Sequence, residues 1–100
     1  MTEAIHDKLQ REEGPVLWRD LRAHAKRGGL LIASAELDLL DAAVAIATDD
    51  AARVEAWLGG GQLFKPDLAT LESWDDDLDK PFRAVVVQPW ALAKEASASP

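Results

Sequence analysis

The sequence contains no cysteine among its 100 residues. This absence excludes a disulfide framework, a thiolate nucleophile and any zinc or iron–sulfur site that depends on cysteine ligands. Long apolar runs are missing as well, because the longest, residues 42–47, is far shorter than the roughly twenty residues of a membrane helix. The N-terminal stretch lacks the continuous apolar segment of a signal peptide. These absences predict a cytoplasmic protein that has no membrane partner.

Basic residues are also scarce. Lysine and arginine number 11 against 18 aspartates and glutamates, which gives a formal net charge of −7. Nucleic acids and anionic membranes both favour a basic surface, so the sequence predicts neither as a partner. With 48% hydrophobic residues the chain can form a folded core. We expect a single domain over residues 1–94 and a disordered tail, rich in alanine and serine, over residues 95–100.

Apolar spacing, caps and breakers predict eight elements in the order α-α-β-β-α-β-α-β. They are helices over residues 2–13 and 15–26, strands over 30–33 and 37–48, a helix beginning after Asp49 or Asp50, a strand over 62–64, a helix beginning after Asp67, and a strand over 82–92. The predicted class is α+β. We expect a small mixed or antiparallel sheet of three to four strands, with the helices packed mainly on one face.

The segment 37–48 is compatible with two structures. As a helix it would align Leu37, Leu40 and Val44 on one face, and its alanines favour that state. As a strand it alternates larger and smaller side chains. We choose the strand because Asp49 or Asp50 is a natural N-cap for the following helix, and a helix ending at Thr48 would leave no connecting loop.

No catalytic or metal-binding constellation emerges from the spacing of the polar residues. Asp75, Asp77 and Asp79 resemble the start of a calcium loop, but Lys80 and Val86 stand where its glycine and glutamate are required. The two histidines lack the spacing of a helical zinc site, and no serine lies in a nucleophile turn. We therefore predict no cofactor and no metal, and the sequence leans against an enzyme; an enzyme would have to use aspartates as general acid or base.

The four tryptophans are the most informative residues. Trp18, Trp57 and Trp74 fall on apolar helical stripes and are expected in the core. Trp90 follows Pro89, which lacks a backbone donor and so predicts a sheet edge or a bulge. An apolar edge strand invites pairing with another chain. We therefore predict a non-enzymatic interaction or regulatory module that either self-associates as a homodimer or binds an unknown protein partner. The interface residues would be Val85, Val87, Pro89, Trp90 and Leu92.

A small-molecule-binding module is the alternative function. Pockets of that class combine aromatic walls with a few polar groups. The candidate ligand-binding residues are Trp57, Trp90 and Arg27 as the frame, with Asp38, Asp49 and Asp50 as polar contacts.

Motifs spread from Pro15 to Leu92 resemble a bacterial family known as domain of unknown function 2288. The matching features are Pro15-Val16, Trp18, Arg27-Gly28, Leu30-Leu31, Leu37-Asp38-Leu39, Val44 to Ala47, Asp49-Asp50, Val54, Trp57-Leu58, Gly61, Leu63, Val85 to Val87, Pro89-Trp90 and Leu92. The resemblance implies a bacterial, cytosolic, single-domain protein and supports a strand over residues 39–47. It implies no activity and no catalytic residue.

Overall fold

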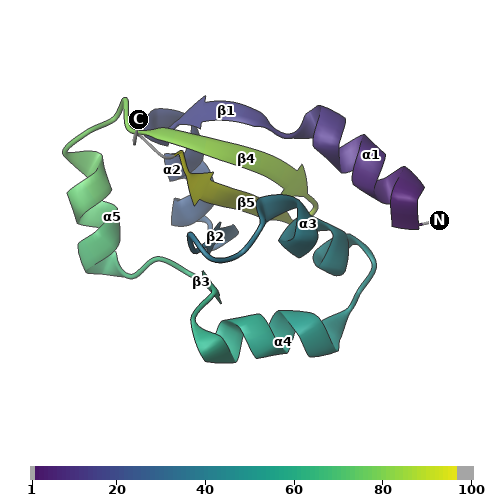
Figure 1. Ribbon diagram of the computed structural model, residues 1–100. Coiled ribbons are helices and arrows are strands. Elements are labelled where there is room, and N and C mark those ends of the chain that lie inside the picture. The colour runs from purple at the N-terminus through teal and green to yellow at the C-terminus, as the bar shows by residue number, and fades with distance from the viewer. Residues whose placement is uncertain (1, 97–100) are drawn as a thin grey trace.

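The computed structural model of the protein describes residues 2–96 (Figure 1). This part of the chain forms five helices and five strands. The helices are α1 (Thr2–Glu12), α2 (Trp18–Lys26), α3 (Leu39–Ala47), α4 (Ala51–Gly60) and α5 (Leu68–Asp75). The strands are β1 (Gly14–Leu17), β2 (Leu30–Ala33), β3 (Leu63–Phe64), β4 (Pro81–Val87) and β5 (Trp90–Glu95). The predicted α+β class is therefore correct, although the order of elements differs from the expected one.

All five strands form one open mixed sheet in the order β1-β4-β5-β2-β3. Only β2 and β5 run parallel; the other three pairs are antiparallel. The predicted single strand over residues 82–92 is instead the hairpin of β4 and β5, with Gln88 and Pro89 in its turn and a cis peptide bond between them. Pro89 needs no ladder donor at that place. The sheet accordingly has five strands instead of three to four.

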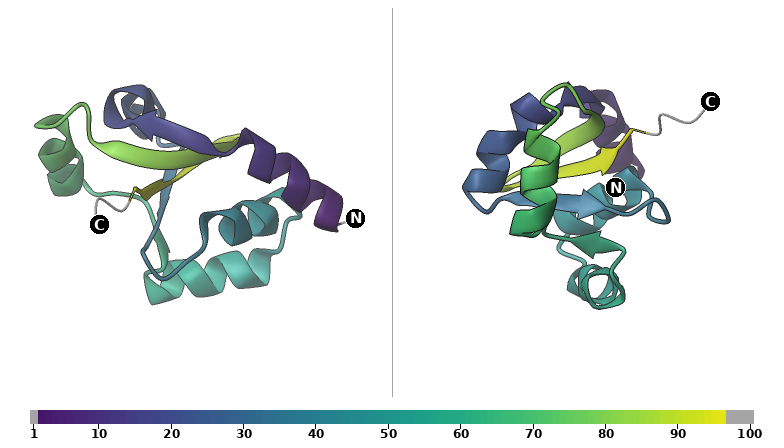
Figure 2. Two further views of the ribbon diagram at one scale, coloured as in Figure 1. Left: turned by 45° about the horizontal axis from the view of Figure 1, so that its top comes forward. Right: turned by 90° about the vertical axis from the view of Figure 1, so that its left-hand side faces the viewer.

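Helices cover both faces of the sheet, so the prediction that they pack mainly on one face is wrong. Along β2, Leu31 belongs to one buried cluster with α1 and α3, whereas Leu30 and Ile32 belong to a second cluster with α2 and α5. Figure 2 shows α2 and α3 on opposite sides of the strands. The buried side chains along β2 and β5 alternate between the two clusters, as the period of two requires.

The predicted strand over residues 37–48 is wrong, because residues 39–47 form helix α3. The Asp38 carboxylate caps this helix by accepting a hydrogen bond from the Leu40 backbone N–H at 2.9 Å. Asp49 has a φ of 56°. Aspartate tolerates this left-handed conformation, so the chain turns from α3 into α4 within three residues. The sequence prediction assumed that two consecutive helices need a longer connecting loop. The short corner at Asp49 connects them without one.

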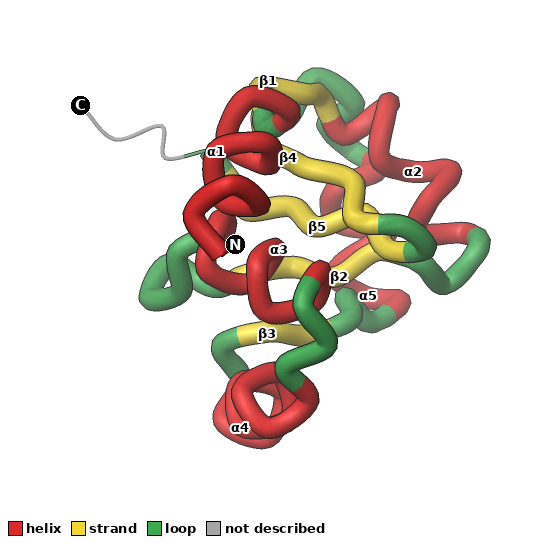
Figure 3. Tube along the Cα trace, turned by 90° about the vertical axis from the view of Figure 1, so that its right-hand side faces the viewer, coloured by secondary structure: helices red, strands yellow, loops and turns green. Residues whose placement is uncertain are grey.

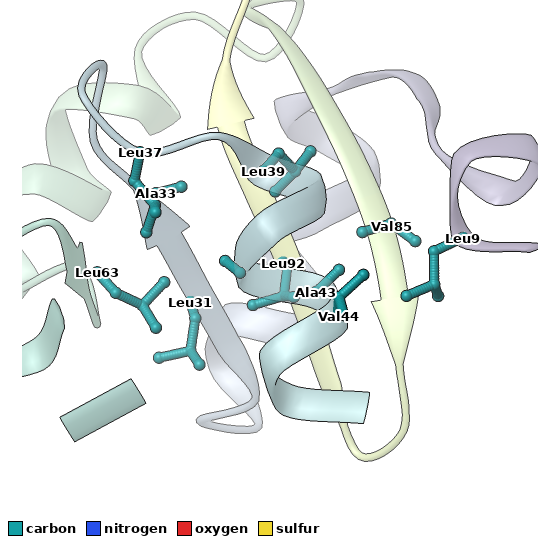
Figure 4. Packing of buried hydrophobic residues seen from close by; sticks show 11 residues of the cluster. Leu9, Leu31, Ala33, Leu37, Leu39, Ala43, Val44, Leu63, Val85 and Leu92 are labelled. Atoms are coloured by element: carbon teal, nitrogen blue, oxygen red, sulfur yellow. The ribbon is translucent and has the colours of Figure 1, made fainter. Parts of the chain in front are cut away.

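Helix α3 packs its alanines against one face of the sheet. The sequence had instead predicted that this segment is a strand within the sheet. Ala42 and Ala43 are fully buried, and α3 contacts both β4 and β5. Figure 4 shows Ala43 and Val44 facing the cluster that contains Leu92 and Val85. The sheet is complete without this segment because β1 and the β4–β5 hairpin supply its other strands.

The predicted helix over residues 15–26 begins three residues later than expected. Gly14–Leu17 is strand β1, which pairs with Ala84 to Pro81 of β4. Pro15 is compatible with this place because β1 is an edge strand, where a missing ladder donor is tolerated. Helix α2 starts at Trp18, and the Asp20 carboxylate accepts the backbone N–H of Leu17 at 3.3 Å. The long-range pairing with β4 decides the boundary.

Other elements agree with the sequence to within one to three residues. Helix α4 has Asp50 as its N-cap, and α5 has Asp67, whose carboxylate accepts the Thr70 N–H at 2.9 Å. Strands β2 and β3 lie where apolar residues follow glycines. At the C-terminal end β5 continues through Glu95, and residues 97–100 of the expected tail lie outside the described residues.

A hydrogen bond between two distant segments attaches α5 to α2. The Trp18 indole Nε1–H donates to the Asp75 carboxylate at 2.7 Å, and the Arg22 Nε lies 2.9 Å from the same oxygen. The Trp18 hydrogen bond, with Arg22 and Lys26 as nearby positive charges, lowers the pKa of Asp75 below its ordinary value. The ionised carboxylate is therefore the form that the fold favours.

The lowered pKa of Asp75 predicts a pH-dependent contribution to stability. Because the folded pKa lies below the unfolded one, this contribution is complete above the unfolded pKa and is lost as the pH falls through the folded value. We expect Asp75→Asn to be less stable than wild type at neutral pH, and we expect this difference in unfolding free energy to shrink as the pH falls below the ordinary aspartate pKa of about 4. Urea unfolding across this range measures it. Glu55→Gln, on the exposed side of α4, is the control; a difference for Asp75→Asn that does not change with pH would contradict the prediction.

Candidate functional site

The floor of the candidate site consists of side chains from three neighbouring strands. Leu31 on β2 pairs with Leu92 on β5, and Trp90 precedes Leu92 by two residues, so it lies on the same face of the sheet. On the other side of β2, Ile32 pairs with Phe64 of β3. The same register, continued by one residue, brings Lys65 beside Leu31. Lys65 and Leu31 are thus neighbours across β3 and β2, and Trp90 lies diagonally from Leu31 on β5, on the same face of the sheet.

The end of α3 and the length of α4 lie beside these residues and leave an open groove of about 510 Å³, which we call the α3–α4 groove. Its volume lies within the ~300–1,000 Å³ typical of small-molecule sites. The lining is mostly apolar and includes only three charged residues. The lining residues are Leu31, Ala45, Ile46, Asp49, Asp50, Ala51, Val54, Leu58, Lys65 and Trp90.

Helix α4 is the outer wall of the groove, and its main neighbours are α3 and β3. None of its residues is buried, and Figure 3 shows it at the margin of the molecule, beyond β3. Both of its ends are backbone turns with positive φ, at Asp49 and at Gly61, where φ is 81°. Leu58 remains 45% exposed on this wall. The groove is therefore open to solvent along α4.

The three charged residues of the groove differ in their partners. The Lys65 ammonium lies 5.1 Å from the centre of the Trp90 ring, and Lys65 takes part in none of the four ion pairs found among the side chains of residues 5–96. The Asp50 carboxylate accepts the Arg53 backbone N–H at 3.3 Å as the cap of α4. Asp49 is exposed at the α3–α4 corner. Lys65 is thus the charged residue whose side chain extends over the floor of the groove.

Three of the six predicted ligand-binding residues line this groove: Asp49, Asp50 and Trp90. Trp57 lies on α4 but packs toward the core cluster, with the Arg53 guanidinium 5.0 Å from its ring centre. Asp38 caps α3 and borders a separate, more polar hollow near Lys94. Arg27 ends α2, where its guanidinium contacts His24. The structure therefore divides the predicted set between four places.

Sequence reasoning missed Lys65 and Leu31 as members of the site. A signal for Lys65 was available: it follows the two-residue strand Leu63–Phe64, and the period of two sets it on the same face as the buried Leu63. What the sequence does not contain is the strand order that brings Lys65 next to β2 and within reach of Trp90.

The C-terminal strands are not sheet edges, so the prediction that they form an edge is wrong. β5 lies between β4 and β2, and β4 lies between β1 and β5. Of the expected interface residues, Val85 and Leu92 are buried, Val87 and Trp90 are half-buried and Pro89 is exposed in the turn. Buried Val85 and Leu92 have no surface to offer a partner in this fold.

The true edges of the sheet are poor templates for strand pairing. On β1, Pro15 has no N–H, and the Leu17 N–H is occupied by Asp20. At the other edge, β3 comprises only two residues. Short strands and proline are the usual means by which edges avoid pairing with another chain.

Several classes of site are not found among the described residues. No cluster of three or more histidine, aspartate or glutamate side chains in this part of the chain could hold a metal ion. Within residues 2–96 there is also no helix with the length and apolar character needed to cross a membrane.

Fold and groove together define a small α+β domain with a five-stranded mixed sheet and one apolar groove beneath an outer helix. The chain belongs to the family described as "Protein of unknown function (DUF2288)", whose model matches residues 4–95. The family resemblance drawn from the sequence motifs is thereby confirmed, although its support for a strand at residues 39–47 is not.

A solved structure shares this fold. The NMR solution structure of PA1075 from Pseudomonas aeruginosa is 36% identical to the chain, with a TM-score of 0.81. The alignment covers 97% of this chain and 90% of PA1075. No curated protein matches the chain.

Proposed function

We propose that this domain is a non-enzymatic binding module and that the α3–α4 groove is its binding site. The observation that carries the proposal is the combination of size and lining: about 510 Å³ with Trp90 in the floor and few charged groups. Apolar concavities with a small number of polar groups are the usual sites of small-molecule recognition. This favours the small-molecule alternative over association through the C-terminal strands.

A regulatory role is compatible with the position of α4. This helix forms one wall of the groove and exposes its other side to solvent, so that a ligand in the groove contacts an element whose outer surface is available to a partner. Self-association through β4 and β5 is not part of the proposal, because both strands are already paired on two sides.

A matched pair of variants on α4 tests the proposal. Ala51 lines the groove and Ala52 does not, yet both are exposed at the start of the helix. We expect the neutral dye N-phenyl-1-naphthylamine to bind the wild-type protein and to raise its melting temperature by mass action. Ala51→Phe fills the groove and should weaken the affinity for the dye at least about tenfold, whereas Ala52→Phe should leave this affinity unchanged. Fluorescence titration gives the dissociation constant of the dye for the wild type and for each variant.

Two results would contradict the proposal. One is a dye that binds equally well to both variants, because it then occupies another surface. The other is a wild-type protein that binds neither this dye nor any member of a small-molecule library in a thermal-shift screen.

A further inference from the structure

The position of Lys65 restricts which apolar molecules the groove can take. Lys65 follows β3, and its ammonium lies 5.1 Å from the ring centre of Trp90 at the start of β5. Because β2 separates β3 from β5 in the sheet, the lysine side chain must extend across β2 to reach that ring. Its charge therefore lies over the floor of the groove, and is now solvated through the open side.

An apolar ligand that fills the groove excludes this water. A neutral hydrocarbon laid against Leu31 and Trp90 would leave the Lys65 ammonium desolvated and without a partner, which is costly. The cost is avoided in two ways: Lys65 moves out of the groove and loses its contact with Trp90, or the ligand carries an anion that pairs with the ammonium. Only the second keeps the charge compensated and the floor intact.

The two aspartates of the groove do not provide an equivalent site for a cation. The Asp50 carboxylate already accepts the Arg53 N–H and lies at the positive end of the α4 dipole. Asp49 is exposed at the corner, where water screens its charge. The face of Trp90, which would otherwise attract a ligand cation, is already occupied by Lys65.

We propose that the groove binds a small apolar carboxylic acid, with the carboxylate on the Lys65 ammonium and the hydrocarbon body along Leu31, Ile46 and Val54. The charge complementarity comes from Lys65 and the shape from the apolar walls of β2, α3 and α4. This inference rests on the proposed function, since it names the ligand class of the same groove.

Three ligands of equal chain length test the charge preference: octanoate, octanol and octylamine. Titration calorimetry on the full chain should show octanoate as the tightest of the three. Lys65→Met keeps the apolar stem of the side chain without its charge and should weaken the affinity for octanoate by about tenfold or more. In the same variant octanol should bind as well as, or better than, in the wild type, because no ammonium is then desolvated. Lys8→Met, on the exposed side of α1, is the matched control and should change the affinity for neither octanoate nor octanol.

Failure of this inference is distinguishable from failure of the proposed function. Octanoate and octanol that bind alike, with no effect of Lys65→Met, would overturn the acid preference while the groove remained a binding site. Octylamine binding most tightly, and weakening in Asp49→Asn, would overturn it in favour of a cation. If the neutral dye and all three ligands fail to bind, both proposals are wrong.

Discussion

Replacing Trp18 by alanine is expected to cost the protein about 3–5 kcal/mol of unfolding free energy, the range observed when a buried tryptophan or phenylalanine is truncated. Trp18 is 1% exposed, and its ring centre lies 5.0 Å from that of Trp74 and 5.9 Å from that of Phe82. Truncation removes this aromatic contact, opens a cavity beneath α2 and leaves Asp75 without the indole donor. A domain whose whole stability is about 5–15 kcal/mol would lose much of it.

Chemical unfolding measures the loss, and two further variants make it interpretable. Trp18→Phe keeps a ring in the cluster but removes the hydrogen bond to Asp75, so its loss should lie between those of wild type and Trp18→Ala. Trp57→Ala truncates a half-buried tryptophan on α4 and should cost less. Equal losses for Trp18→Ala and Trp57→Ala would contradict the central role of the Trp18 cluster.

The second large effect is expected on the opposite face of the sheet. Ala43 is fully buried between α3 and the sheet, and the small side chain allows the helix to lie close to β4 and β5. Ala43→Leu inserts three carbon atoms at a fully buried position, so we expect a loss of about 1–3 kcal/mol of unfolding free energy from overpacking. Thermal or urea unfolding measures it.

Ala47→Leu is the matched control on the same helix. Ala47 is exposed at the end of α3, so the same substitution there should change stability by no more than about 0.5 kcal/mol. A neutral Ala43→Leu would show that α3 does not pack closely on the sheet. Helix propensity does not explain a difference, because alanine and leucine are both strong helix formers.

Local signals predicted the elements whose ends are fixed by capping and breaking residues. Asp50 and Asp67 begin α4 and α5, and Gly61 ends α4 with a left-handed φ. The strand Leu30–Ala33 follows from an apolar run after two glycines. In these cases the deciding interactions lie within a few residues of the element itself, so the sequence contains them.

Prediction failed where the deciding interaction is distant. Residues 39–47 have both helical and alternating apolar spacing, and the choice depends on the Asp49 corner and on the face of β4 and β5 that α3 covers. Gly14–Leu17 becomes a strand only because β4 lies beside it. Pro89, interpreted as an edge signal, instead lies in the turn of an interior hairpin.

The candidate site shows the same division. Trp90, Asp49 and Asp50 were selected because aromatic and acidic residues suggest binding, and they line the groove. Lys65 was not selected, because its importance comes from the order of three strands. Arg27 and Asp38 were selected by type alone, and the fold places them elsewhere.

By itself, the sequence determined the α+β class, the family, the N-caps of α4 and α5 and the absence of cysteine chemistry, since these depend on composition, motifs and contacts between near neighbours. Only the tertiary structure decided the strand order, the helical state of residues 39–47 and the meeting of Lys65 with Trp90. The physical reason is that side chains distant in the sequence become neighbours only through the pairing of strands and the packing of helices on them.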